Sequence, residues 1–198
     1  PEEHRHKLPA GTGLILKTPE EWKAVGQIAP IQPHMSDHMI GSPNALQNCR
    51  LALEAGVTSN SVIFVRDGAT LAIGTGEQDR VGCVELAIYK AYHKYEDILS
   101  FRELGLTLYE LKAKAGSDKG FADKLADIQA RAREAHGGLA GSVIISDGFF
   151  PFRDGVDVAM AEGVTAIGQP GGSIRDWEVI QAVNEHSPQV AMVFTGQR

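Results

Sequence analysis

The stretch "SVIISDGFFPFRDGVDVAMAEGVTAIG" (Ser142–Gly168) decides the fold class of this chain. It opens with an apolar run typical of a buried strand, passes through a turn, and continues as a helix pattern over Asp154–Glu162 before a second strand at Val164–Gly168. A helix at Ser173–Glu185 and a strand at Val190–Gly196 follow at similar spacing. Strands that alternate with helices in this way predict a parallel α/β unit.

The residues before this unit predict a hairpin and several helices. Two apolar runs flank Asp67-Gly68 in "SVIFVRDGATLAIG" (Ser61–Gly74), which is the signature of a two-residue β-hairpin. We expect an α/β fold with a mixed central sheet and a single domain over residues 1–198, in which an irregular N-terminal arm (1–41) precedes the core (42–198). Helices are predicted at Thr18–Gly26, at Ser42–Gly56, from about Val84 to Tyr95, and within residues 96–138.

Composition narrows the class of protein. The chain has 198 residues, of which 43% are hydrophobic and 22% charged, as in an ordinary globular domain. A net charge of −6 without a basic patch argues against a nucleic-acid partner. We expect no membrane span and no signal peptide, and a cytoplasmic location. Cys49 and Cys83 stand far apart without metal-ligand spacing, so we interpret them as buried, reduced thiols.

The aromatic turn between the first two strands of the α/β unit is the first candidate site. In an open α/β sheet, ligands bind at the carboxyl ends of strands, beside helix N-termini. "DGFFPFRD" (Asp147–Asp154) lies at such a place, and its rings would suit a flat heterocycle. Asp154 and Asp157 are spaced as a helix-capping pair. The alternative is structural: Phe149 and Phe150 would cover the sheet while Arg153 pairs with Asp154.

Two more segments are predicted at the same edge. In "QPGGSIRD" (Gln169–Asp176), Ser173 and Asp176 have the spacing of a capping box, and the helix start would offer N–H groups to an anion. The alternative is a plain turn. Asn60 stands at a strand start, and "GTGEQDR" (Gly74–Arg80) follows a strand end. Arg80 there suits a phosphate, although a surface arginine beside a hairpin is the alternative.

Three strings together identify a family resemblance. "SNSVIFVRDGATLAIGTGEQDRV", "SDGFFPFRDGVDVAMAEGVTAIGQPGGSIRDWEVI" and "AMVFTGQR" resemble the C-terminal half of aminoimidazole carboxamide ribonucleotide transformylase, which is usually fused to inosine monophosphate cyclohydrolase. The resemblance spans residues 45–198 and implies a three-layer fold like that of cytidine deaminase. It also implies formyl transfer from formyl-tetrahydrofolate to a purine-precursor ribonucleotide, in a homodimer or with a partner subunit. The deaminase zinc signature is absent from the sequence, so we expect no zinc and no other metal.

The resemblance assigns roles to individual residues. Asn60 matches a catalytic asparagine that contacts the substrate amide. The nucleotide-binding set is Asn60, Arg80, Phe149 and Arg198. The folate-binding set is Val81, Pro151, Phe152, Asp154 and Ser173.

The family's Lys-His pair, which moves the proton during transfer, has no match in this sequence. It belongs to an upstream subdomain, and a folate-side histidine of the family would follow Arg198. His34 and His38, four residues apart, have the spacing of a substitute base or of metal ligands, but Pro33 and Gly41 bracket them and no third ligand is evident. Three functions therefore stay open: a formyltransferase acting alone or with a partner chain that carries the pair, a stand-alone inosine monophosphate cyclohydrolase, and a non-catalytic nucleotide- or folate-binding paralogue.

Overall fold

The computed structural model describes residues 14–15 and 59–196. The strands are β1 (Leu14–Ile15), β2 (Ser61–Arg66), β3 (Ala69–Thr75), β4 (Val143–Ser146), β5 (Ala166–Gln169) and β6 (Ala191–Phe194). The helices are α4 (Arg80–Leu104), α5 (Leu108–Ala115), α6 (Lys119–Glu134), α7 (Asp154–Ala161) and α8 (Asp176–Glu185), with a short 3-10 helix, η2 (His136–Gly138). The helices predicted before residue 57, the His34–His38 pair, Cys49 and Arg198 lie outside the described residues.

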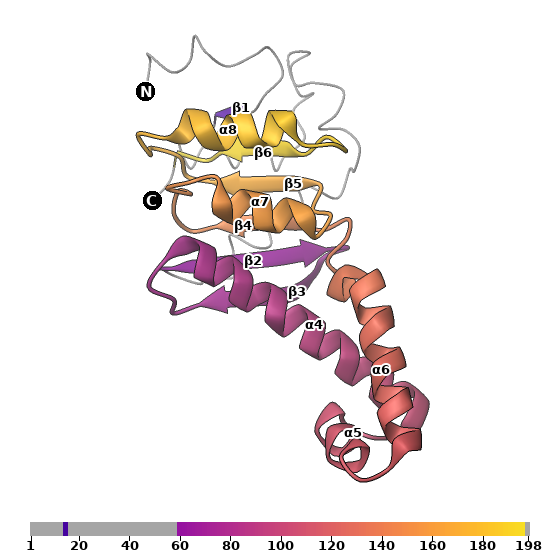
Figure 1. The fold of residues 1–198 in the computed structure, drawn as a ribbon. Coiled ribbons are helices and arrows are strands. Elements are labelled where there is room, and N and C mark those ends of the chain that lie inside the picture. The colour runs from indigo at the N-terminus through magenta and orange to yellow at the C-terminus, as the bar shows by residue number, and fades with distance from the viewer. Residues whose placement is uncertain (1–13, 16–58, 197–198) are drawn as a thin grey trace.

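The strands form one mixed sheet in the order β1-β6-β5-β4-β2-β3 (Figure 1). The four strands β1, β6, β5 and β4 run parallel to one another, whereas β2 runs antiparallel to both of its neighbours, β4 and β3. The predicted α/β class and mixed sheet are therefore confirmed. The alternation β4-α7-β5-α8-β6 is also confirmed, with element ends within three residues of those predicted.

The predicted hairpin joins β2 to β3. Asp67 and Gly68 occupy its tip with φ of 53° and 76°, the left-handed values that a two-residue type I′ turn requires. The register pairs Ser61 with Thr75, and it shifts between Phe64 and Val65. The hairpin thus places the start of β2 and the end of β3 at the same edge of the sheet.

The larger apolar core lies between the sheet and the helices α4, α7 and α8, which cover one face (Figure 1). The opposite face carries a second buried cluster, which comprises Ile63, Val65, Val143, Ile145 and Ala166. A sheet that buries apolar side chains on both faces is what a three-layer α/β fold requires, in agreement with the expected architecture. The kinship with cytidine deaminase stays a prediction.

Helix α4 is much longer than the predicted Val84–Tyr95. It begins after Asp79, whose side chain accepts a hydrogen bond from the Gly82 N–H at 2.6 Å, and it ends at Gly105, which has a left-handed φ of 66°. Its 25 residues run past the sheet. The C-terminal part of α4, together with α5 and α6, forms a helical arm that stands clear of the sheet (Figure 1).

The base of the helical arm is tied to α7. Tyr92 Oη donates to a carboxylate oxygen of Glu162 at 2.8 Å, and His136 Nδ1 lies 3.3 Å from the same oxygen. Burial and the hydrogen bond to Glu162 raise the pKa of Tyr92 to about 12. Further out, the arm has a small core of its own, made of Leu108, Leu111, Ile128 and Ala132.

Candidate functional site

The strand directions bring the predicted site segments to one edge of the sheet. Strands β3 to β6 end there and the antiparallel β2 begins there, so the segments 59–61, 75–82, 147–154, 169–176 and 195–196 are neighbours. We call this set of segments the carboxyl edge. The N-termini of α4, α7 and α8 all lie at it (Figure 1). The strand order and directions therefore bring the predicted site segments together, as expected, at the carboxyl ends of the parallel strands.

Arg80 is buried at the centre of the carboxyl edge, with 7% of its surface exposed. Its Nη1 donates to the Ser61 carbonyl at 2.9 Å and to Asp147 Oδ1, and its Nη2 donates to Asn60 Oδ1 at 2.8 Å. This excludes the surface arginine that was one interpretation of the sequence. Three of its five N–H donors thus have acceptors inside the protein, whereas Nε has none among the described residues.

Asp147 is the counter-charge of Arg80. Its carboxylate also accepts from Ser59 Oγ at 2.6 Å and from the Ser61 N–H at 2.9 Å. Burial opposes ionisation, but the hydrogen bonds from Ser59, Arg80 and Ser61, with the charge of Arg80, outweigh it and lower the pKa of the Asp147 carboxyl below its ordinary value of 3.8. Asp147 is thus an anion at neutral pH. Its only signal in the sequence is that a carboxylate directly follows β4.

Asn60 is held on several sides. Its Nδ2 donates to the carbonyls of Glu77 and Gln78 at 3.0 and 3.2 Å. The backbone carbonyl of Asn60 accepts from the Gly76 N–H at 3.1 Å and from Cys83 Sγ at 2.8 Å. Cys83 is a buried free thiol, as predicted, and burial raises its pKa.

The aromatic turn divides its rings between the core and the surface. Phe150 is fully buried, Phe149 and Pro151 are half-buried, and Phe152 is 47% exposed. The Phe150 N–H donates at 2.8 Å to Oε1 of Gln169, a fully buried side chain that sequence reasoning did not single out. Phe150 therefore belongs to the core, as the structural interpretation held, while Phe152 faces outward.

The start of α7 differs from the prediction. Arg153 occupies the N-cap position with helical dihedrals and no side-chain cap, and Asp154 is the first helical residue. Asp157 does not cap but pairs with Arg153 at 2.7 Å, four residues apart on the helix, and Arg153 also reaches Glu185 at 3.2 Å. The predicted capping pair and the Arg153–Asp154 pair are therefore wrong. The Asp154 carboxylate is exposed, and it accepts from the Gly155 N–H at 2.7 Å.

The start of α8 supplies its own anion. The Asp176 carboxylate accepts from the N–H groups of Gly172 and Ser173 at 2.7 and 3.2 Å, so the donors predicted for a ligand already bind this side chain. Ser173 Oγ accepts from the Arg175 N–H at 3.1 Å and not from the Asp176 N–H, so only one half of the predicted Ser173–Asp176 capping box is present, and α8 begins at Asp176 without a side-chain cap. The Arg175 guanidinium lies 5.0 Å from the centre of the Phe152 ring. This contact links the turn after β4 to the turn after β5.

The remaining predicted residues lie within this frame. Val81 is in the first turn of α4, and a Cβ added to Gly155 would lie 4.0 Å from its Cα, so the starts of α4 and α7 adjoin. The structure thus brings Asn60 and Arg80 into direct contact. It places Val81, Phe149, Pro151, Phe152, Asp154 and Ser173 along the same edge.

The described residues include no group of three or more His, Cys, Asp or Glu side chains arranged to hold a metal ion. None of the helices in that part of the chain is long and apolar enough to cross a membrane. Across the carboxyl edge segments there is neither histidine nor lysine.

Comparison with known proteins places this fold and edge in a family. The sequence model described as "AICARFT/IMPCHase bienzyme" matches residues 14–90, which include Asn60, Arg80 and Val81. The bifunctional purine biosynthesis protein PurH of Xanthomonas euvesicatoria is 33% identical over 195 residues, which cover 95% of this chain. The PurH proteins of Acidithiobacillus ferrooxidans and Aquifex aeolicus are each 39% identical, over 142 and 140 residues.

The chain belongs to the AICARFT/IMPCHase family. It corresponds to only part of its relatives, since it spans 27% of the Xanthomonas protein and 19% of the other two. The alignment with the Xanthomonas protein covers nearly the whole chain, so it also takes in the aromatic turn and the start of α8, which the family model does not match.

Proposed function

We propose that this chain takes part in purine biosynthesis as the nucleotide- and folate-binding part of a formyltransferase. The reaction would move a formyl group from formyl-tetrahydrofolate to the exocyclic amine of aminoimidazole carboxamide ribonucleotide. The observation that carries the proposal is the convergence of the predicted site segments, distant in sequence, at the carboxyl edge. The relatives' shared name, bifunctional purine biosynthesis protein, supports the pathway.

The proposed division of the edge follows its chemistry. Phe152 exposes a ring and Asp154 exposes a carboxylate within the same turn, which suits a planar heterocycle with N–H groups at its rim. With Val81, Pro151 and Ser173 these residues would form the folate side. Asn60, Arg80 and Phe149 would form the nucleotide side, joined by Arg198 outside the described residues.

The proton-transfer step points to a second contributor. The substrate amine is a poor nucleophile because its lone pair is delocalised into the imidazole and carboxamide, so attack needs a positioned proton acceptor. Such a group contributes roughly 10²–10⁴-fold to the rate. Because the carboxyl edge segments contain no histidine or lysine, we propose that a partner chain with the Lys-His pair, or a second copy, completes the site.

The test assays both half-reactions with this chain alone and mixed with a chain that carries the upstream subdomain. We expect formyl transfer to rise by about 10²-fold or more on mixing. Cyclisation of the formylated nucleotide by the chain alone would instead establish a cyclohydrolase. Nucleotide binding without turnover in either mixture would establish a non-catalytic paralogue and refute the proposed transferase.

A further inference from the structure

We propose that Asp147 is a positioning residue that fixes the orientation of the Asn60 side-chain amide through Arg80. The consequence for formyl transfer rests on the proposed function, whereas the positioning itself does not. The residues involved come from three segments of the carboxyl edge that are distant in sequence: the start of β2, the first residue of α4 and the first residue after β4.

The first step concerns the buried charge. A buried arginine such as Arg80, 7% exposed, needs an opposing charge and hydrogen-bond acceptors, because removal from water is costly for an ion. Asp147 is the carboxylate that pairs with Arg80 among the described residues. Arg80 Nε is buried and has no acceptor in that part of the chain, so the guanidinium depends all the more on its Nη contacts.

The second step concerns how tightly Asp147 and Arg80 are seated. Ser59 Oγ and the Ser61 N–H both donate to the carboxylate, so Asp147 cannot turn away without leaving backbone and side-chain donors unpaired. Gly148 packs against the guanidinium, since a Cβ added there would lie 2.4 Å from Arg80 Nη2. The guanidinium is therefore held between the start of β2 and the loop after β4.

The third step is the consequence for Asn60. Arg80 Nη2 donates to Asn60 Oδ1, and both amide protons of Nδ2 are directed at the Glu77 and Gln78 carbonyls. A flipped amide would place a donor against Arg80 and an acceptor against two carbonyls, so only one orientation is compatible with these partners. Among the described residues Arg80 is the one donor to Oδ1, so its second lone pair can accept from a substrate N–H. Arg80 thus acts by orienting Asn60, and Asp147 acts by holding Arg80.

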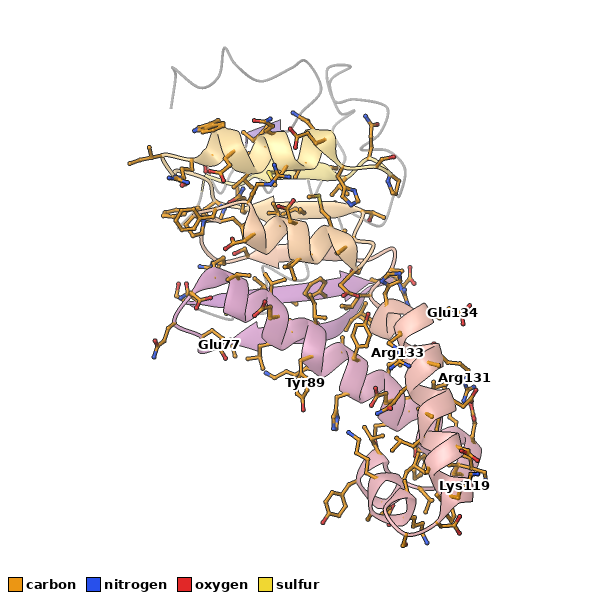
Figure 2. The ribbon with its side chains drawn as sticks, in the orientation of Figure 1. Glu77, Tyr89, Lys119, Arg131, Arg133 and Glu134 are labelled. Carbon is orange, nitrogen blue, oxygen red and sulfur yellow. The ribbon has the colours of Figure 1, made fainter. Side chains whose placement is uncertain are left out.

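The experiment compares Asp147→Asn with a matched control, Glu103→Gln. Glu103 also pairs with an arginine, Arg131, but on the helical arm, and Figure 2 shows Arg131 on α6 far from Glu77 of the carboxyl edge. The readout is the Asn60 side-chain NH2 signal in a ¹⁵N NMR spectrum, assigned by its loss in Asn60→Ser. We expect Asp147→Asn to shift this signal and speed its hydrogen exchange about tenfold, and Glu103→Gln to leave it unchanged. An unaltered Asn60 signal in folded Asp147→Asn overturns the proposal.

A second variant covers the case in which Asp147→Asn does not fold. Arg80→Lys keeps the charge for Asp147 but cannot also reach Asn60 with a planar fork, so the Asn60 signal should change in the same way. No change in Arg80→Lys would count against the proposal equally.

A kinetic readout separates this inference from the proposed function. In the two-chain mixture, Asp147→Asn should lower kcat for formyl transfer by about 10²-fold, as misplacement of a contact residue does, with a much smaller change in nucleotide Kd. A wild-type mixture without transferase activity would refute the proposed function while the NMR result still decides the role of Asp147. A disturbed Asn60 signal with unchanged kcat would refute the catalytic consequence alone.

Discussion

At the scale of single residues, the carboxyl edge is built from polar side chains that hold backbone in place. Gln169 and Asp147 each bind the N–H of a residue in another segment, and Arg80 binds the Ser61 carbonyl. Phe152 and Asp154 are exposed beside this frame, and the proposed function assigns them to the folate side. Two predictions belong to this scale.

Replacement of Asp154 should separate the two proposed ligands. We expect Asp154→Ala to weaken folate binding by about tenfold, the cost of leaving heterocycle N–H donors without an acceptor, and to leave nucleotide binding nearly unchanged. The control is Asp157→Ala, one turn along α7, where the carboxylate pairs with Arg153 instead. Calorimetric titration with each ligand measures both affinities. Equal weakening of both in a folded variant would contradict the assignment of Asp154 to the folate side.

Acid should remove the contribution of Asp147 to stability. Because its pKa is lowered in the folded state, its stabilising effect is present above the ordinary value of 3.8 and is lost as the pH falls through the lower folded value. We expect Asp147→Asn to lower the free energy of unfolding by about 1.5–3 kcal/mol at pH 7, typical of a hydrogen bond to a charged group. Urea unfolding of both proteins from pH 7 to pH 3 measures the gap. A gap that stays constant below pH 3.8 would show that the carboxylate is not stabilised by its partners.

At the scale of elements, the sequence predicted correctly those helices, strands and turns that are determined by interactions between residues close in sequence. The Asp67-Gly68 turn and the β4-α7-β5-α8-β6 alternation follow from turn chemistry and hydrophobic periodicity, which act within a few residues. A shorter α4 is predicted from the sequence because the start of the helix depends on the Asp79 cap, which was not identified, and because no Gly or Pro after Gly82 interrupts the helix before Gly105. The meeting of the candidate segments at one edge of the sheet followed from the topology. The Arg80–Asp147 pair could not be predicted, because its partners lie 67 residues apart.

The contact between β3 and α4 depends on the absence of a side chain at Gly74. A Cβ there would lie 1.9 Å from the Cys83 carbonyl oxygen, so the helix would have to move away from the strand. We expect Gly74→Ala to lower the free energy of unfolding by about 1–3 kcal/mol, as overpacking of a core does. Gly116→Ala is the control, since its φ of −66° is helical and its nearest neighbour is 3.4 Å away. Thermal unfolding compares the two, and equal melting temperatures would refute the close packing.

At the scale of the whole molecule, helix α4 is shared by the sheet part and the helical arm, whose apolar cores differ in size. The sheet with α4, α7 and α8 encloses the large apolar cluster, whereas the helical arm buries only a few side chains (Figure 1). Tyr89, on α4, points away from the rest of the molecule in Figure 2, and Phe101 and Tyr109 on the arm are also exposed. The distribution of apolar burial therefore predicts unequal local stability.

Hydrogen exchange should reveal this difference. We expect the backbone amides of α5 and α6 to exchange faster than those of β2, β4 and β5, because opening the arm exposes less apolar surface than opening the sheet. Exchange measured by mass spectrometry, peptide by peptide, tests the order. Uniform protection over both parts would mean that the arm opens only with the whole protein.

Helix α4 is continuous from the carboxyl edge to the helical arm. The helix begins with Arg80, whose guanidinium donates to Asn60 Oδ1, and it ends inside the arm with no break between the two. The helical arm and Arg80, which donates to Asn60 Oδ1, are thus carried by one continuous helix, so a contact that restrains the arm also restrains the start of α4.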